Sequence, residues 1–255
     1  MSEVLGYSEF LTTLNKKPSL KHGLIVDTNV LISATYDSDK FFEPTTQFFD
    51  YLAEHEIPIY CNVNVRAEFL EIHRRIIFTE ALIDFFREVD RTLLPTDISA
   101  QLGKWSANNK KRVDEQRSPL RLSEADIKKV KLGLMQIIDG EKNLWASLCE
   151  NKIGNKLESL WNRTEDELGL NFLSTRNEDS SPLFNSSPEW SDAVRLIEKH
   201  GLSSSDAMIV NMFFCSNFDA IISSDQEVAD IIGQSGLHEK ICFVPDSLKL
   251  SMRKA

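Results

Sequence analysis

Four acidic residues stand where a carboxylate can do chemistry. Asp27 and Asp225 each follow directly on a short apolar run that predicts a buried strand. Glu68 lies early in a helix predicted after another such strand, and Asp206 lies in the first turn of a later helix. In open parallel sheets ligands bind beyond the carboxyl ends of the strands. We therefore expect Asp27, Glu68 and Asp225 to converge, whereas Asp206 follows a helix and is not placed by this rule.

Carboxylates that converge without a counter-charge repel one another. At about 4 Å and an effective dielectric constant near 20, each close pair costs roughly 4 kcal/mol. A divalent cation removes this cost, and a ligand set of oxygens without His or Cys suits Mg²⁺ or Mn²⁺ better than Zn²⁺. Two such ions can activate a water and stabilise the leaving oxygen of a phosphodiester. The acids therefore predict a metal-dependent hydrolase.

Each acid also has an ordinary structural interpretation. Asp27 and Asp225 are suited to cap a helix or form a turn, and Asp206 favours the positive end of a helix dipole. Glu68 taken alone is typical of a solvated helix face. The functional interpretation depends on the four acids acting together.

Strands and helices alternate at both ends of the chain, which predicts an α/β protein with a central parallel sheet. Residues 1–22 are expected to form a short helical prelude, and the predicted helix from 65 towards 93 has a possible break at Thr79. The remaining predicted strands lie at 24–26, 57–61, 219–223 and 240–245, and the remaining predicted helices at 44–56, 189–200, 207–216 and 226–232.

The middle of the chain has a different texture, more polar and with weaker helical patterns. We interpret 96–188 as a mostly helical insertion, with helices at 124–138 and 141–161 and a polar exit loop rich in Ser, Asn and Pro. The split core is then 1–95 and 189–255.

Four motifs resemble those of PIN-domain ribonucleases. They are the strand with its acid, Ile25-Val-Asp-Thr-Asn-Val-Leu-Ile32; the helix motif Arg66-Ala-Glu-Phe-Leu70; the third acid in Ser204-Ser-Asp-Ala-Met-Ile209; and the last strand with its acid, Asp219-Ala-Ile-Ile-Ser-Ser-Asp225. Each motif alone is weak, but their ordered set is fairly specific.

The resemblance covers about 22–95 and 189–246. It implies a three-layer α/β/α sandwich and a two-metal-ion endoribonuclease that uses Mg²⁺ or Mn²⁺ to cut RNA. Glu68 and Asp206 lie 138 residues apart, which is more than compact members use, and the insertion accounts for the excess.

The resemblance also assigns roles to individual residues. Asp27, Asp206 and Asp225 would bind metal, and Glu68 would bind metal or orient the attacking water. Supporting hydrogen bonds would come from Thr28, Asn29, Ser204 and Ser205. Asp230 is a weaker candidate, for which a solvated helix face is the simpler interpretation. If the chain resembles the toxin-like members, a protein inhibitor (an antitoxin) is an expected partner. The resemblance also implies that the protein could form a homodimer.

Charge bears on how RNA would be held. The chain carries a net charge of −10 and has a pI near 5.1, so a basic surface must be local. From Lys104 to Lys131 there are nine Lys and Arg against four Asp and Glu. Candidate RNA contacts are Arg66, Arg74, Arg75, Lys104, Trp105, Lys110, Lys111 and Arg112. The alternative is a solvated basic helix with Trp105 packed on the core.

The same residues also bear on other classes of protein. A haloacid-dehalogenase phosphatase needs an acid two residues after the first Asp, where this chain has Asn29. No glycine-rich phosphate-binding motif is present. An inactive PIN-like module that binds a protein or nucleic acid remains open, as does a structure-specific DNA nuclease. The sequence lacks a long apolar run and a secretory signal, and its four Cys show no CxxC spacing, so we expect a cytoplasmic protein with reduced thiols and no membrane partner.

Overall fold

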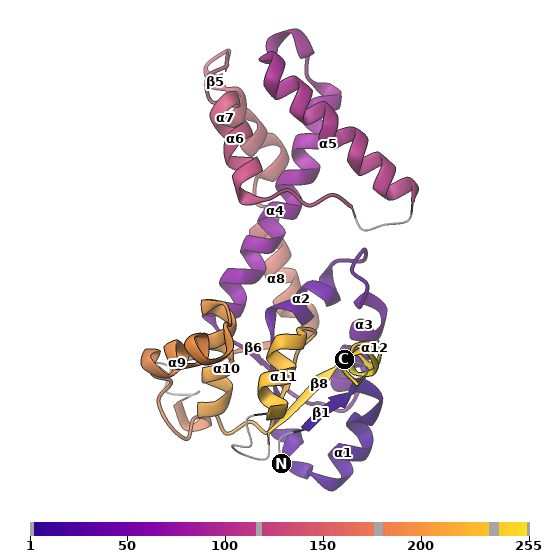
Figure 1. Cartoon of the computed structure of the whole chain (residues 1–255), viewed down its shortest axis with the longest axis vertical. Helices are drawn as coiled ribbons and strands as arrows, with labels where there is room; N and C mark the ends of the chain where they lie inside the picture. The colour runs from indigo at the N-terminus through magenta and orange to yellow at the C-terminus, as the bar shows by residue number, and fades with distance from the viewer. Residues whose placement is uncertain (1–2, 116–118, 176–180, 235–239, 254–255) are drawn as a thin grey trace. The chain divides into compact units, whose positions relative to one another are not determined.

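A computed structural model describes residues 3–115, 119–175, 181–234 and 240–253. The chain forms two compact units (Figure 1). Unit 1 comprises Met1–Phe69 and Arg163–Ala255, and unit 2 comprises Leu70–Asn162. Two helices cross the boundaries between the units, one where the chain enters unit 2 and one where it leaves.

Unit 1 is built on a six-stranded sheet in which every neighbouring pair is parallel, in the order β1-β8-β7-β2-β3-β6. Its inner strands β2, β7 and β8 are buried along their whole length, as apolar and β-branched strands in parallel sheets usually are. The strands are β1 (Glu3–Gly6), β2 (Leu24–Val26), β3 (Ile59–Cys61), β6 (Leu170–Phe172), β7 (Ala220–Ile222) and β8 (Ile241–Val244).

Helices connect and cover these strands. The chain moves along the sheet in one direction from β2 to β3 and in the opposite direction from β7 to β8. Right-handed crossovers then put the two sets of helices on opposite faces, which is compatible with a three-layer sandwich. The helices within unit 1 are α1 (Phe10–Lys16), α2 (Thr28–Thr35), α3 (Phe42–Glu54), α9 (Trp190–His200), α10 (Ser204–Cys215), α11 (Gln226–Gln234) and α12 (Asp246–Met252), with 3₁₀ turns at Tyr7–Glu9, Pro18–His22 and Ser181–Leu183.

Unit 2 has a hydrophobic core of its own. Phe78, Leu82 and Phe86 of α4 pack there with Leu102 and Trp105 of α5. The elements are α4 (Val63–Glu88) and α8 (Lys156–Leu168), which both continue into unit 1, and α5 (Thr96–Asp114), α6 (Glu124–Leu134), β4 (Ile138–Asp139), β5 (Lys142–Asn143) and α7 (Leu144–Leu148), with a 3₁₀ turn at Arg91–Leu93 and a π turn at Cys149–Ile153.

The predicted parallel sheet is confirmed, but several elements differ from expectation. The expected helical prelude contains an edge strand, β1, and α4 runs unbroken through Thr79, whose hydroxyl donates to the Arg75 carbonyl at 2.7 Å. The helix predicted at 141–161 is interrupted by the β4–β5 hairpin and the π turn. Short edge strands such as β1 and β6 give little periodic signal.

The boundaries of the two units also differ from the predicted ones. The prediction was a split core at 1–95 and 189–255 with an insertion at 96–188. Residues 70–95 supply part of the unit 2 core, because α4 continues into it. Leu170–Phe172 lies in unit 1, because β6 pairs with β3.

Two further expectations concern cysteines and membranes. All four Cys are free, and burial raises the pKa of the Cys61 thiol to about 12. Among the described helices, none has the length and apolar character needed to cross a membrane.

Candidate active site

Asp27 stands where β2 ends and α2 begins. It caps α2, since its Oδ1 accepts a hydrogen bond from the Thr28 N–H at 2.7 Å. Its Oδ2 accepts from the Ser223 hydroxyl at 2.7 Å. The Asp27 side chain is fully buried, which is rare for a carboxylate, and no ion pair of Asp27 occurs among the described residues. The site is therefore built around a covered acid.

Asp225 reaches the same place from the neighbouring strand. β2 and β7 pair in parallel register, with Val26 beside Ile222. The Asp225 N–H donates to the Ser223 hydroxyl at 3.0 Å, and Asp225 Oδ2 accepts from the Asn29 amide at 3.3 Å. Ser223 and Asn29 thus connect the two strand ends and their acids.

Glu68 joins from α4, which begins after β3. Its Oε2 accepts two hydrogen bonds, from the Thr28 hydroxyl at 3.0 Å and from the Ser205 hydroxyl at 2.8 Å. Thr28 follows Asp27, and Ser205 precedes Asp206. Glu68 therefore connects the end of β2 to the start of α10.

Asp206 lies in the first turn of α10, which Ser203 caps. The Ser203 hydroxyl accepts from the Asp206 N–H at 3.1 Å and donates to Asp206 Oδ2 at 2.6 Å. Half-buried Asp206 is close enough to Glu68 and Asp225 for their charges to raise its pKa. The structure therefore brings all four acids into one neighbourhood, including the one that the strand rule does not place.

The electrostatics of the site favour neutral carboxyls or a bound cation. Burial raises the pKa of Asp27 to about 7; the Ser223 hydrogen bond opposes this rise, and the charges of Asp206, Glu68 and Asp225 add to it. Burial also raises the pKa of Asp206, again with help from neighbouring carboxylates. Both shifts have the same cause, negative charge that is poorly solvated and poorly compensated.

The donor chemistry of the site suits a hard divalent cation, since it offers carboxylate, hydroxyl and amide oxygens. Within the described part of the chain, however, no three His, Cys, Asp or Glu side chains are arranged to hold an ion as they stand. Both oxygens of Asp27 accept hydrogen bonds from protein donors, and Glu68 uses Oε2 for two of them. Ion binding therefore requires side chains to turn from these donors towards a common point.

Three of the four residues expected to support the acids make hydrogen bonds to them. Thr28, Asn29 and Ser205 make the hydrogen bonds just described, whereas Ser204 is exposed and Ser203 caps the helix. Ser203 and Ser223 also make hydrogen bonds to the acids or their backbone, but they were not among the residues expected to support the site. Their signal was position: a Ser three residues before Asp206, and a Ser two residues before Asp225 at a strand end.

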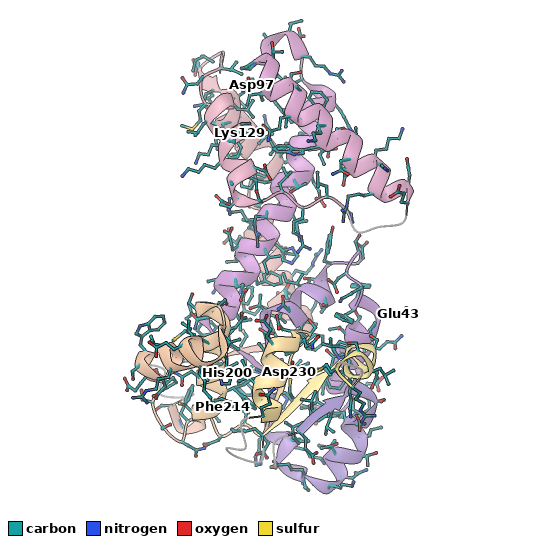
Figure 2. All side chains as sticks on the ribbon, in the orientation of Figure 1. Glu43, Asp97, Lys129, His200, Phe214 and Asp230 are labelled. Carbon is teal, nitrogen blue, oxygen red and sulfur yellow. The ribbon has the colours of Figure 1, made fainter. Side chains whose placement is uncertain are left out.

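Helix α11 carries two further acids, Glu227 and Asp230. Glu227, in the first turn of α11, adds to the negative charge felt by Asp206. Asp230, the weaker candidate for the site, is half-buried further along the same helix (Figure 2).

The candidate RNA contacts fall into two groups. Arg74 is paired with Glu71 and Glu124, and Trp105 is only 8 % exposed within the unit 2 core, so it cannot stack on a base without unpacking. The remaining candidates are more open. Arg75 and Arg112 are half-buried, Arg75 with its Nε 3.8 Å from Glu71, and the exposed ones are Arg66, Lys104, Lys110 and Lys111.

Comparisons of this chain with models of known protein families, with curated proteins and with solved structures found no match.

Proposed function

We propose that unit 1 is a metal-dependent endoribonuclease in which Asp27, Glu68, Asp206 and Asp225 hold Mg²⁺ or Mn²⁺, two ions when fully loaded. One observation carries this proposal: hydrogen bonds through Thr28 and Ser223 connect Glu68 and Asp225 to the buried Asp27, and Asp206 is close enough for its charge to raise the pKa of Asp27. A network of this kind has no obvious structural purpose, because ionised Asp27 weakens the fold.

The parallel sheet supports the proposal further. Asp27 and Asp225 lie beyond the carboxyl ends of adjacent strands, the usual place for a site in such sheets. A PIN-like three-layer sandwich is the finer description that we propose for this unit. It rests on the four motifs and on the strand order.

The residues divide the work between them. Asp27 and Asp225, fixed by Ser223, would form the rigid side of the metal site. Glu68 is held through Oε2, so its Oε1 is the atom we assign to a cation or to the proton of the attacking water. Bound divalent ions would lower the pKa of that water and neutralise the leaving oxygen. Asp206, in the first turn of α10, completes the ligand set.

Cleavage of RNA tests this function directly. Purified protein is incubated with a single-stranded RNA and with a DNA of the same sequence, each with Mn²⁺ or with EDTA. We expect internal cuts in the RNA only with Mn²⁺, and a loss of about 1000-fold or more in Asp27→Asn and in Asp206→Asn. Asp230→Asn is the matched control, since Asp230 lies outside the network and should leave the rate within about threefold of wild type.

Each outcome bears on the proposal. Full activity in Asp27→Asn or Asp206→Asn removes the mechanism. Cleavage of the DNA in preference to the RNA keeps the mechanism and replaces the substrate with DNA.

A second candidate is a binding module whose acids no longer bind metal. It is favoured by the hydrogen bonds that already occupy the carboxylates and by the lack of a ready ion cage among the described residues. Thermal unfolding separates the two candidates. A working site should be stabilised by Mn²⁺ through mass action, and Asp27→Asn should lose most of that rise in melting temperature. Equal melting temperatures with and without Mn²⁺ favour the binding module.

A further inference from the structure

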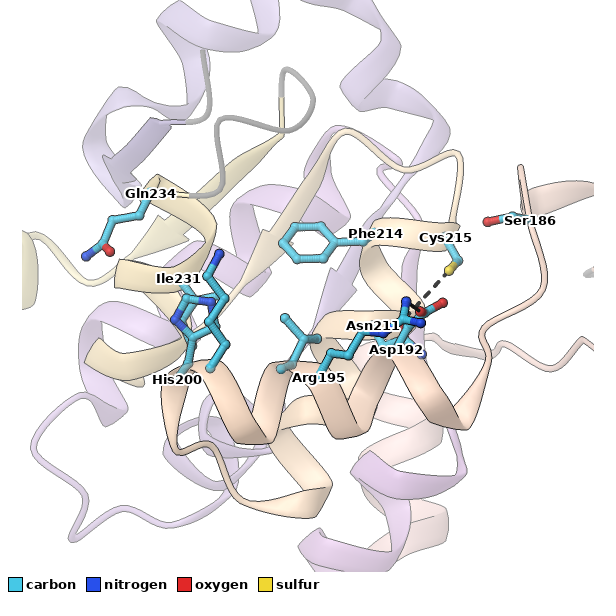
Figure 3. A pocket seen from close by; sticks show the side chains of 11 residues that line it. Ser186, Asp192, Arg195, His200, Asn211, Phe214, Cys215, Ile231 and Gln234 are labelled. Atoms are coloured by element: carbon cyan, nitrogen blue, oxygen red, sulfur yellow. Dashed lines mark hydrogen bonds and ion pairs between the residues drawn. The ribbon is translucent and has the colours of Figure 1, made fainter.

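A groove opens in unit 1 between α9, α10 and α11 (Figure 3). Its volume is about 430 Å³, within the range of ligand-binding clefts. Helix α9 contributes one continuous face, α10 its last turns, and α11 its C-terminal half. The lining residues on α9 are Asp192, Arg195, Leu196, Lys199 and His200.

The floor of the groove is apolar. Leu196, Phe214 and Ile231 line it from three helices, and Figure 3 shows the Phe214 ring on the opposite side of the groove from Arg195 of α9. Leu196 and Phe214 are only half-buried, although residues between three helices are usually covered. The floor therefore offers apolar surface that a ligand could cover.

The polar groups of the floor are already satisfied. The Asn211 amide donates to the Glu189 carbonyl at 2.8 Å, and the Cys215 thiol donates to Asn211 Oδ1 at 3.7 Å. A ligand therefore gains little by hydrogen bonding at the floor. Its polar contacts must be made at the rim.

The rim is basic within an acidic unit. Unit 1 contains 13 Lys and Arg against 25 Asp and Glu, yet the groove presents Arg195, Lys199 and His200 against Asp192. Asp192 pairs with Arg195 at 2.8 Å. Lys199 is thus the cation of the rim that Asp192 does not offset, and His200 lies beside it with ring nitrogens that can hydrogen bond.

We propose that this groove binds an acidic amphipathic helix of a partner protein. Apolar side chains one turn apart would cover Leu196, Phe214 and Ile231, and flanking carboxylates would pair with Lys199 and His200. The floor favours a peptide over a nucleic acid, because apolar side chains of a helix can cover the half-buried Leu196 and Phe214, whereas a charged phosphate backbone cannot.

The groove is separate from the acids of the candidate active site. Asp206 is in the first turn of α10, and Phe214 is eight residues later, roughly 12 Å along the helix axis. Peptide binding should therefore depend neither on metal nor on Asp27, and it goes beyond the proposed nuclease.

Selection from a peptide library tests the proposal. Phage that display random peptides of about 16 residues, roughly four helical turns, are selected on the full-length protein. Counter-selection uses Lys199→Glu and, separately, Leu196→Gln, which change the rim and the floor. Lys21→Glu is the matched control, because it makes the same change of charge at an exposed position of unit 1 outside the groove.

We expect enriched peptides with apolar residues at helical spacing and acids beside them. A synthetic peptide of the enriched sequence should bind about tenfold more weakly to Lys199→Glu and to Leu196→Gln, and equally well to Lys21→Glu and Asp27→Asn. RNA cleavage by Lys199→Glu should match wild type, so failure here and failure of the nuclease proposal are separable.

Three outcomes would overturn the inference. The first is that enriched peptides bind all variants alike, which places them elsewhere on the surface. The second is that the selection yields basic sequences or sequences without helical periodicity. The third is that a short single-stranded oligonucleotide loses binding in Lys199→Glu while the peptide does not, which makes nucleic acid the occupant.

Discussion

The two units differ in net charge and in whether they bury charged side chains. Unit 1 has 25 acidic against 13 basic residues, and unit 2 has 14 against 16, so the chain's net charge of −10 belongs to unit 1 alone. Unit 1 also buries an acid, Asp27, at the centre of a cluster of other acids. Among the described residues of unit 2, by contrast, no carboxylate is buried, and the buried polar residues there are His73 and Thr79.

This difference separates two tasks that one surface cannot perform well. A cation site needs converging carboxylates, and a surface that holds RNA needs exposed Lys and Arg. The acidic total therefore says little about RNA binding. We propose that unit 1 supplies the chemistry and that unit 2 supplies contacts to the RNA backbone.

The largest expected effect concerns the stability of unit 1. The folded-state pKa of Asp27 is about 7, above its ordinary value of 3.8, so between these values the folded state binds more protons than the unfolded state. Stability from this group is then greatest below about pH 4 and is lost as pH rises to 7. Between pH 5 and pH 8 the loss is roughly 2–3 kcal/mol.

Urea unfolding of the metal-free protein at pH 5 and pH 8 measures this loss. Asp27→Asn removes the charge and keeps an oxygen for the Thr28 N–H, so the variant should exceed wild type in stability at pH 8 and approach it at pH 5. Saturating Mn²⁺ should reduce the difference. Hydrogen exchange at a single pH shows which unit gains stability in Asp27→Asn. A gain in protection confined to peptides of unit 2 would show that the contrast between the units is wrong.

The next effect concerns Ser223, which connects two acids of unit 1. Ser223→Ala removes a donor to Asp27 Oδ2 and an acceptor for the Asp225 N–H, both provided by a fully buried hydroxyl. We expect the Mn²⁺ concentration for half-maximal cleavage to rise about 10- to 100-fold, as losses of supporting hydrogen bonds at metal sites do.

Ser205→Ala is the matched control for Ser223→Ala. It removes one of the two hydroxyls that donate to Glu68, and Thr28 remains as the other donor. Its effect should be about threefold or less. Equal effects of the two variants would mean that Ser223 does not hold the rigid side of the site.

The same contrast explains how far the sequence could lead. The strands that carry Asp27 and Asp225 are apolar runs with an acid at the end, and such local patterns predicted both strands and their place in a parallel sheet, whereas their direct pairing came from the structure. Asp206 needed the resemblance, because the path from α9 into α10 is fixed by tertiary packing. The positions of Ser203 and Ser223 were a weak signal in the sequence, and their contacts show which atoms they bind.

Unit 2 was harder to predict for a physical reason. Its core is formed by helices that also carry many charges, so the apolar period is diluted, and α4 gives no sign of where one unit ends. Trp105 illustrates the ambiguity. Next to Lys104, it is compatible with base stacking or with core packing, and only burial distinguishes the two.

The smallest expected effect tests the task assigned to unit 2. Lys104, Lys110 and Lys111 are exposed on α5, so replacing all three with Gln should remove phosphate contacts without disturbing the core. We expect KM for single-stranded RNA to rise about 3- to 10-fold at an unchanged kcat. The slope of log affinity against log salt should become shallower by roughly 2, as expected for three lost contacts.

A triple Gln variant at Lys128, Lys129 and Lys131 of α6 is the control, with the same loss of charge in the same unit. A rise in KM confined to the α5 variant assigns the contact to that helix. Equal rises mean that the whole unit acts through its charge, and no rise in either variant means that unit 2 does not hold the RNA. In that last case the contrast between the units is one of charge only, and the exposed Arg66 near Glu68 in unit 1 becomes the next residue to replace.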